Sequence, residues 1–152
     1  MEAIETKQLI KFALKLLSQR EHFSSEIISK LKRKKATAAQ TEEVIEYLNS
    51  FKYLNDLKTL ENFAKEIAFS GRGVNYLKRK LYEKGAFELF SREFFTLEAE
   101  FDAAQIFIKK LKTSDGNEIL KKLVSRGFSN EAVFLVLKEL KKEDLLENRS
   151  DI

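Results

Sequence analysis

Apolar residues recur along the chain at the spacing of an α-helix. Leu9, Phe12, Ala13, Leu16 and Leu17 follow the i, i+3, i+4, i+7, i+8 pattern of one helix face. The sequence holds no Pro, and no alternating apolar and polar run bounded by turn residues appears in it. The pattern predicts an all-α protein of about nine helices, each of roughly 8–16 residues. Further stripes of this kind are Val44, Ile45, Leu48 and Phe51, and Val133, Phe134, Val136, Leu137 and Leu140.

Polar residues and glycines mark where these helices begin and end. Ser24, Thr41 and Ser129 each stand just before one or two glutamates, a pattern that predicts N-caps with acidic first turns. Gly85 and Gly127 follow basic helix ends, where a left-handed residue can close a helix. The chain is therefore expected to consist of short helices separated by tight turns.

One short sequence pattern occurs three times. It consists of an apolar pair, a Leu four residues after the first member of the pair, a basic residue and a helix stop. The copies begin at Ile27, Leu77 and Ile119, and in the middle copy Lys78 takes the second apolar position. Since an amphipathic helix precedes and follows each copy, we predict three tandem three-helix repeats, at residues 1–56, 57–101 and 102–152. Such units are small, so we expect them to stack.

Composition places the chain among globular proteins. Hydrophobic residues make up 43% and charged residues 34%, enough for a core with a solvated surface. The 28 basic and 24 acidic residues give a net charge of +4, which is modest for a protein that coats nucleic acid. No stretch approaches the roughly 20 apolar residues of a membrane span, and the acidic start of the chain does not resemble a secretory signal. We expect a cytoplasmic protein without membrane contact.

The second helix of each predicted repeat is locally basic. Because residues i and i+4 share a helix face, Lys30 aligns with Lys34, and Lys80 with Lys84. In one interpretation, stacked repeats present these clusters to phosphates or to an acidic protein surface. In the other, they are solvated helix ends where cations are favoured. The candidate binding residues are Lys30, Lys32, Arg33, Lys34, Lys78, Arg79, Lys80, Lys84, Lys121, Lys122 and Arg126.

Other candidate sites have simpler interpretations. The segment of Gly71, Arg72 and Gly73 lacks the Gly-Lys-Ser/Thr ending of a phosphate loop, so we interpret it as a flexible turn. The only histidine, His22, is expected at a helix end or turn. Five aromatic side chains at near-helical spacing are interpreted as a core stripe rather than a platform for bases. These are Phe87, Phe90, Phe94, Phe95 and Phe101.

The sequence offers no catalytic site. It contains no Cys, no second His, no nucleophile motif and no cofactor fingerprint. No two acidic residues stand out as a pair that would be buried together, as acid–base chemistry requires. We therefore predict a protein that is not an enzyme and that needs no cofactor and no metal.

Four segments, in order along the chain, carry a family resemblance. They are Ala13–Arg20 with Ser24-Ser25-Glu26-Ile27 and Lys30-Leu31; Tyr53-Leu54-Asn55-Asp56; Gly73 with Leu77, Leu81, Lys84 and Gly85; and Ile119, Leu123, Arg126, Gly127, Phe128 and Ser129. These segments resemble the signatures of the RecX family, the modulators of the RecA recombinase. The departures are Asn55, Thr59-Leu60, Ile67 and Lys35, of which Lys35 stands where the family has a Gly.

The resemblance implies an elongated, curved array of three tandem three-helix repeats. It also implies binding along the RecA–DNA filament, within its helical groove, and modulation, chiefly inhibition, of the recombinase, ATPase and co-protease activities of RecA. The expected setting is DNA repair, recombination and the SOS response, and the expected state is a monomer. Direct contact with single- or double-stranded DNA is left open.

Two other functions compete with this one. A helix-turn-helix DNA-binding regulator is one, because three-helix units often place a recognition helix in the major groove. Against it, the chain lacks the compact Gly-containing turn and a clear set of Arg, Asn and Gln base readers. A helical-repeat scaffold for another protein is the second alternative.

Overall fold

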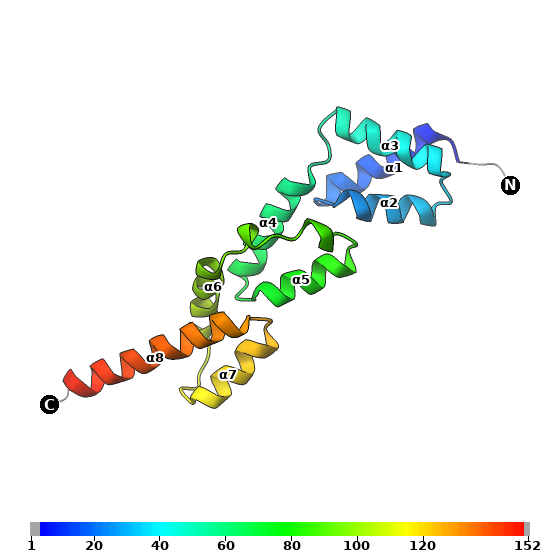
Figure 1. The fold of residues 1–152 in the computed structure, drawn as a ribbon. Helices are drawn as coiled ribbons and strands as arrows, with labels where there is room; N and C mark the ends of the chain where they lie inside the picture. Colours follow the sequence, from blue (N-terminus) through cyan, green and yellow to red (C-terminus); the bar gives the residue numbers. More distant parts are fainter. Residues whose placement is uncertain (1–3, 151–152) are drawn as a thin grey trace. The chain divides into compact units, whose positions relative to one another are not determined.

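The computed structural model describes the backbone of residues 4–150 and the side chains of residues 4–144. All regular structure in these residues is helical, so the all-α prediction is confirmed (Figure 1). The elements are α1 (Thr6–Gln19), α2 (Ser24–Arg33), α3 (Ala38–Ser50), α4 (Asp56–Phe69), α5 (Val74–Glu83), the 3-10 helices η1 (Phe87–Leu89) and η2 (Arg92–Phe94), α6 (Leu97–Lys109), α7 (Gly116–Ser125) and α8 (Asn130–Ser150).

The segment between α5 and α6 departs from the expected pattern of helices. Instead of one further α-helix it forms η1 and η2, because Ser91 between them is extended and its hydroxyl accepts the amide of Glu93 at 3.3 Å. The prediction of a helical stripe of buried phenylalanines is therefore wrong here. Phe95 is 1% exposed, but Phe87 is 47% exposed.

The backbone divides into two compact units. The first unit comprises the chain up to Asn62 together with residues 81–89, and the second comprises residues 63–80 and the chain from Phe90 onward. The three-part division at residues 1–56, 57–101 and 102–152 remains a prediction. The last of its boundaries falls inside the continuous helix α6.

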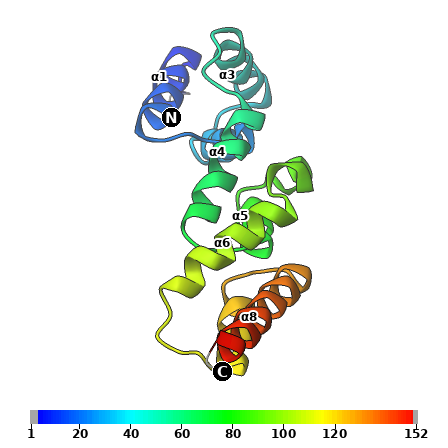
Figure 2. The same cartoon turned by 90° about the vertical axis from the view of Figure 1, so that its left-hand side faces the viewer.

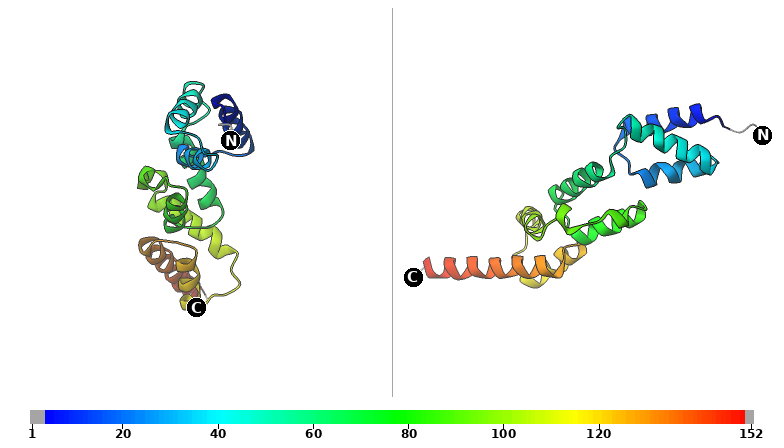
Figure 3. Two further views of the ribbon diagram at one scale, coloured as in Figure 1. Left: turned by 90° about the vertical axis from the view of Figure 1, so that its right-hand side faces the viewer. Right: turned by 45° about the horizontal axis from the view of Figure 1, so that its top comes forward.

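The core of the first unit lies among α1, α2 and α3, which pack side by side (Figures 1 and 3). Only one member of the repeated apolar pair enters this core, because Ile27 is fully buried whereas Ile28 is 42% exposed. The pair in α7 behaves alike, with Ile119 buried and Leu120 37% exposed. The core cluster consists of Leu9, Ala13, Ile27, Leu31, Val44, Leu48 and Leu54.

In the second unit, α8 packs against both α6 and α7 (Figure 2). The turn before α5 is tied to the turn after α7, since the Gly73 amide donates to the carbonyl of Arg126 at 3.1 Å and the Asn75 amide to that of Gly127 at 2.8 Å. A Cβ on Gly73 would lie 2.4 Å from the Cα of Phe128. The segment of Gly71, Arg72 and Gly73 is thus an interhelical turn, as predicted, but it is fixed by backbone contact.

The helix ends agree only partly with the sequence predictions. Ser129 does cap α8, accepting the amide of Ala132 at 3.2 Å. The N-cap of α3 is Thr37, in a reciprocal capping box with Gln40, and Thr41 lies inside the helix, so the prediction for Thr41 is wrong. Ser24 is the first residue of α2, and its amide donates to Asp56 at 2.8 Å.

Candidate partner-binding surface

The basic residues of α2 lie along its last turn and just beyond it. Lys32 and Arg33 are exposed, Lys30 is half-buried, and Lys34 follows the helix as its C-cap. The ammonium of Lys34 sits 4.9 Å from the centroid of the Phe12 ring, a cation–π contact that anchors it to α1. Lys32 and Arg33 are therefore the most accessible cations of this helix.

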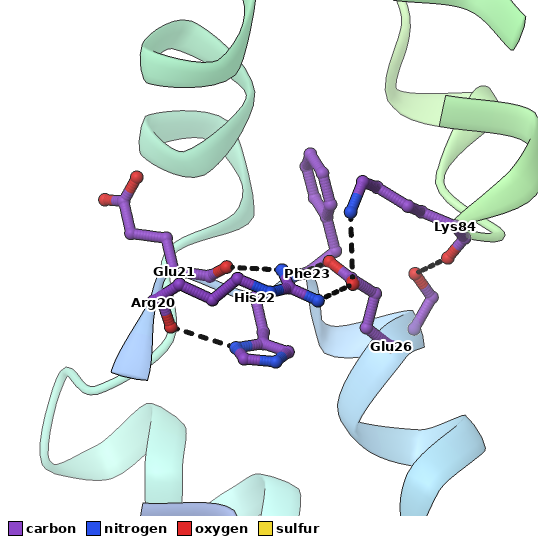
Figure 4. Close-up of polar contacts among 7 residues, drawn as sticks. Arg20, Glu21, His22, Phe23, Glu26 and Lys84 are labelled. Carbon is purple, nitrogen blue, oxygen red and sulfur yellow. Dashed lines mark hydrogen bonds and ion pairs between the residues drawn. The ribbon is translucent and has the colours of Figure 1, made fainter. Parts of the chain in front are cut away.

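Lys84, at the end of α5, is held in a network centred on Glu26 (Figure 4). The Glu26 carboxylate accepts the guanidinium of Arg20 at 2.8 Å, the ammonium of Lys84 at 3.3 Å and the amide of Phe23 at 3.0 Å. The carbonyl of Lys84 also accepts the hydroxyl of Ser25 at 2.8 Å. Lys84 thus has a structural role within the first unit.

The pKa of Glu26 reflects this network. Burial by itself raises the pKa of the carboxyl, but the hydrogen bonds from Arg20 and the Phe23 amide, together with the charge of Lys84, outweigh it and lower the pKa below its ordinary value. Glu26 is therefore ionised at neutral pH and keeps both cations in place.

In the second unit, three cations surround the ring of Tyr76 on α5. The guanidinium of Arg72 lies 4.3 Å from the ring centroid, that of Arg79 5.2 Å and the ammonium of Lys80 5.5 Å. In the part of the chain that the structure describes, neither Arg72 nor Arg79 has a carboxylate partner. We call Arg72, Tyr76, Arg79, Lys80 and Arg126 the Tyr76 cluster.

Arg126 joins this cluster from the C-terminal end of α7. Its guanidinium donates to the carbonyls of Ser70, at 2.9 Å, and Gly71, at 3.4 Å, and lies 4.9 Å from the ring centroid of Phe107. Burial, and then the positive charge of Arg72, lower the pKa of Arg126. Its guanidinium therefore both fixes the turn after α4 and adds to the positive potential of the cluster.

The remaining candidates lie elsewhere. Lys78 rests 5.1 Å from the centroid of the Phe90 ring and is half-buried. Lys121 and Lys122 are exposed on α7. Of the predicted residues, the structure places Arg79 and Lys80 around the Tyr76 ring, Arg126 near Arg72 and over the Phe107 ring, and Lys84 beside Glu26. Whether they contact a partner remains a prediction.

Known proteins resemble this chain over most of its length. A family model described as "RecX, first three-helix domain" matches residues 11–48. The regulatory protein RecX of Prosthecochloris aestuarii is 29% identical over 150 residues, covering 92% of this chain and 98% of that protein. That of Chlorobium phaeobacteroides is 26% identical and covers 88% and 93%. These matches make the chain similar to the RecX family along most of its length.

The fold is also that of solved RecX structures. A crystal structure of RecX from Lactobacillus salivarius aligns with a TM-score of 0.66 at 19% identity, covering 90% of this chain and 96% of that one. In the described residues no helix is both long and apolar enough to cross a membrane, and no group of three potential metal ligands is found there.

One departure of this chain from the RecX signatures that it resembles has a visible backbone consequence. Lys35, just after α2, stands where the resemblance leads us to expect a Gly, and it has a φ of 63°. The left-handed region costs a residue with a Cβ roughly 1–2 kcal/mol. The corresponding Gly85 and Gly127 have φ values of 70° and 85°, so the same left-handed closure recurs after α2, α5 and α7.

Sequence reasoning missed two members of the Tyr76 cluster. Arg72 was interpreted only as part of a turn, and Tyr76 was not considered. Arg79 and Lys80 follow Tyr76 by three and four residues, which places these three residues on one face of α5. That part of the cluster could be predicted from the sequence. The positions of Arg72, in the turn before α5, and of Arg126 could not, since they depend on the conformation of that turn and on the packing of α7 against it.

His22 occupies the turn between α1 and α2, as expected, and is 2% exposed. Its Nδ1 lies 2.9 Å from the carbonyl of Arg20 and therefore carries the proton. Its Nε2 is buried without a hydrogen-bond partner in the described residues. Burial lowers the pKa of His22, with the charges of Arg20 and Lys30 acting in the same direction, so the ring is neutral at pH 7.

Proposed function

We propose that this RecX-like protein binds the RecA–DNA filament and modulates, chiefly by inhibiting, the recombinase, ATPase and co-protease activities of RecA. The Tyr76 cluster is the observation that supports this proposal best. Three cations within 5.5 Å of one ring repel one another, and an anionic partner relieves that repulsion. Arg guanidinium groups also bind phosphate and carboxylate oxygens in pairs, which suits a filament of protein and DNA.

Arg72 and Arg79 are assigned the main contact role within the cluster. Arg79 is exposed, Arg72 is half-buried, and neither has a carboxylate partner in the described residues. The guanidinium of Arg126, by contrast, donates hydrogen bonds to the carbonyls of Ser70 and Gly71. Arg126 therefore adds positive charge to the cluster, while the guanidinium groups of Arg72 and Arg79 donate hydrogen bonds to the partner. The exposed cations of α2 and α7, Lys32, Arg33, Lys121 and Lys122, are assigned a secondary, steering role.

The test is titration of the protein into the host's RecA during ATP hydrolysis on single-stranded DNA. We expect the double variant Arg72→Glu with Arg79→Glu to require at least roughly tenfold more protein for half-inhibition, a change equivalent to about 1.4 kcal/mol. The control is Lys109→Glu with Lys110→Glu, which makes the same change in net charge at two exposed positions of the last turn of α6 and the residue after it.

Two results would contradict the proposal. One is an unchanged inhibition curve for a double variant that retains the wild-type helical circular dichroism. The other is tight binding of free duplex DNA with a strong sequence preference, which would favour the helix-turn-helix alternative. Salt dependence adds a further check, because a contact through phosphates weakens steeply as the salt concentration rises.

A further inference from the structure

An apolar groove lies between α2 and α3 in the first unit, with a volume of about 740 Å³. Its floor includes Ala36 and Ile45, which rest on the buried core cluster. One wall carries Ile28, whose side chain is 42% exposed. The groove thus offers an aliphatic surface that is already fixed in position by the core beneath it.

The exposure of Ile28 has no explanation in the packing of the first unit. The first member of its pair, Ile27, is completely buried, so the core takes only one of the two. A partner that covers Ile28 removes this aliphatic surface from water, which favours binding. Leu120, at the same position of the pattern in α7, is likewise 37% exposed.

The two walls of the groove carry opposite charges. Glu42 and Glu46 stand four residues apart on α3, and both line the groove. Like charges at this spacing destabilise a helix, and in the described residues neither glutamate forms an ion pair. Lys32 lines the groove from α2, also without a carboxylate partner there. A partner with cations on one edge would compensate the acidic wall of α3.

We propose that this groove binds an amphipathic helix of a partner protein, whose aliphatic stripe covers Ile28 and Ile45 and whose Lys or Arg residues pair with Glu42 and Glu46. A groove between two packed helices can bind a third helix, whose apolar residues at i, i+3, i+4 and i+7 enter the groove. The groove selects a cationic partner, whereas the Tyr76 cluster selects an anionic one. It is therefore a second interaction surface, independent of the first.

The test uses two labelled peptides of the length of α3, 13 residues. Both carry Leu at helical spacing; one has Lys and the other Glu on the flanking positions. In fluorescence anisotropy with the full-length chain, we expect the Lys peptide to bind at least roughly tenfold more tightly than the Glu peptide. The double variant Glu42→Lys with Glu46→Lys should reverse that preference, and Ile28→Asp should weaken binding of the Lys peptide at least roughly tenfold.

Matched controls come from the same unit. Glu43→Lys changes one charge on α3 at an exposed position outside the groove lining, and Leu57→Asp changes a 57% exposed aliphatic residue outside it. Both should leave binding of the Lys peptide within twofold of the wild type. Amide hydrogen exchange with bound Lys peptide should show new protection confined to residues 28–49.

Three results would overturn the proposal. Equal binding of the two peptides would show that Glu42 and Glu46 select nothing. Unchanged binding of the Lys peptide to a folded Ile28→Asp variant would place the contact elsewhere. If sedimentation shows that the wild-type chain self-associates and that Ile28→Asp makes it monomeric, the occupant is a second copy of the chain and not a basic helix of another protein.

Discussion

Ser129 binds the carboxylate of Glu100 through both its backbone amide, at 2.7 Å, and its hydroxyl, at 2.6 Å. The same fully buried carboxylate accepts the amide of Val74 at 3.1 Å and the guanidinium of Arg92 at 2.8 Å. One side chain of α6 thereby satisfies backbone donors at the N-termini of both α5 and α8, where helix dipoles favour a negative charge. Glu100 is the polar centre of the second unit.

Replacing Glu100 with Ala should destabilise the protein strongly. Burial by itself raises the pKa of Glu100, but the hydrogen bonds from Ser129, Arg92 and Val74 outweigh it and lower that pKa, so the carboxylate is ionised in the folded protein. Its removal leaves these donors without an acceptor. We expect a loss of about 3–5 kcal/mol in the free energy of unfolding, measured by urea denaturation. Glu98→Ala, at an exposed position of the same helix, should change it by less than about 0.5 kcal/mol.

Gly73→Ala should also be severely destabilising, because its Cβ would meet backbone atoms rather than a movable side chain. The nearest are the Cα of Phe128 at 2.4 Å and the carbonyl oxygen of Gly127 at 2.6 Å. The new methyl group would separate the turn before α5 from the turn after α7, at a cost of several kcal/mol, on the order of the largest effects of single substitutions. The measurement is the thermal unfolding midpoint.

Gly116→Ala provides the matched control for that substitution. Gly116 is the first residue of α7, and no atom lies within 4 Å of its hypothetical Cβ. Since Ala favours helix over Gly by roughly 0.5–1 kcal/mol, this variant should be as stable as the wild type or slightly more stable. Equal effects of the two substitutions would refute the role assigned to Gly73.

The stability of the protein should decrease as the pH falls from about 7.5 to 5.5, because of His22. Burial lowers the pKa of His22 in the folded state below the ordinary value of 6.5. The unfolded chain therefore binds the proton first, and the free energy of unfolding is highest above pH 6.5 and declines below it. The measurement is urea denaturation at several pH values.

His22→Gln should remove this decline, since Gln does not titrate and can still donate a hydrogen bond to the carbonyl of Arg20. Glu26 does not interfere in this pH range, because its pKa lies below the ordinary value of 4.5 and its contribution is lost only at lower pH. A decline of the same size in His22→Gln would assign the pH dependence to another group.

Most of the helices could be predicted from local features of the sequence. The stripes that begin at Leu9 and Val44 became the core of the first unit, since helix periodicity is a property of neighbouring residues. The missed cap at Thr37 was also local: Thr37 with Gln40 three residues later is a capping-box pattern. Glu100 offered a weaker sign, since it lies on the same helix face as Ala103 and Ala104, both of which are buried.

Long-range pairing could not be predicted in this way. Lys84 and Glu26 are 58 residues apart, and Arg126 meets the carbonyl of Ser70 across 56 residues. Each of these contacts depends on how separate helices pack, and one sequence does not encode a distance between them. For this reason eleven basic residues were equivalent candidates in the sequence, whereas the structure gives Lys84, Arg126 and Arg79 different surroundings.

These surroundings predict opposite effects for two substitutions that each remove one positive charge. Lys84→Met leaves Glu26 with only Arg20 as its cation, so the free energy of unfolding should fall by about 1 kcal/mol. The proposed inhibition of RecA should change less than twofold in the folded variant, because the ammonium of Lys84 is directed to Glu26. Arg79→Ala should leave stability unchanged and weaken inhibition. The free energy of unfolding should change by less than about 0.5 kcal/mol, and half-inhibition should need roughly three- to tenfold more protein. Urea denaturation and the RecA ATPase titration, made on the same preparations, give both quantities. If Lys84→Met weakened inhibition as much as Arg79→Ala, Lys84 would contact the partner despite its ion pair, and the network around Glu26 would have to open when the filament is bound.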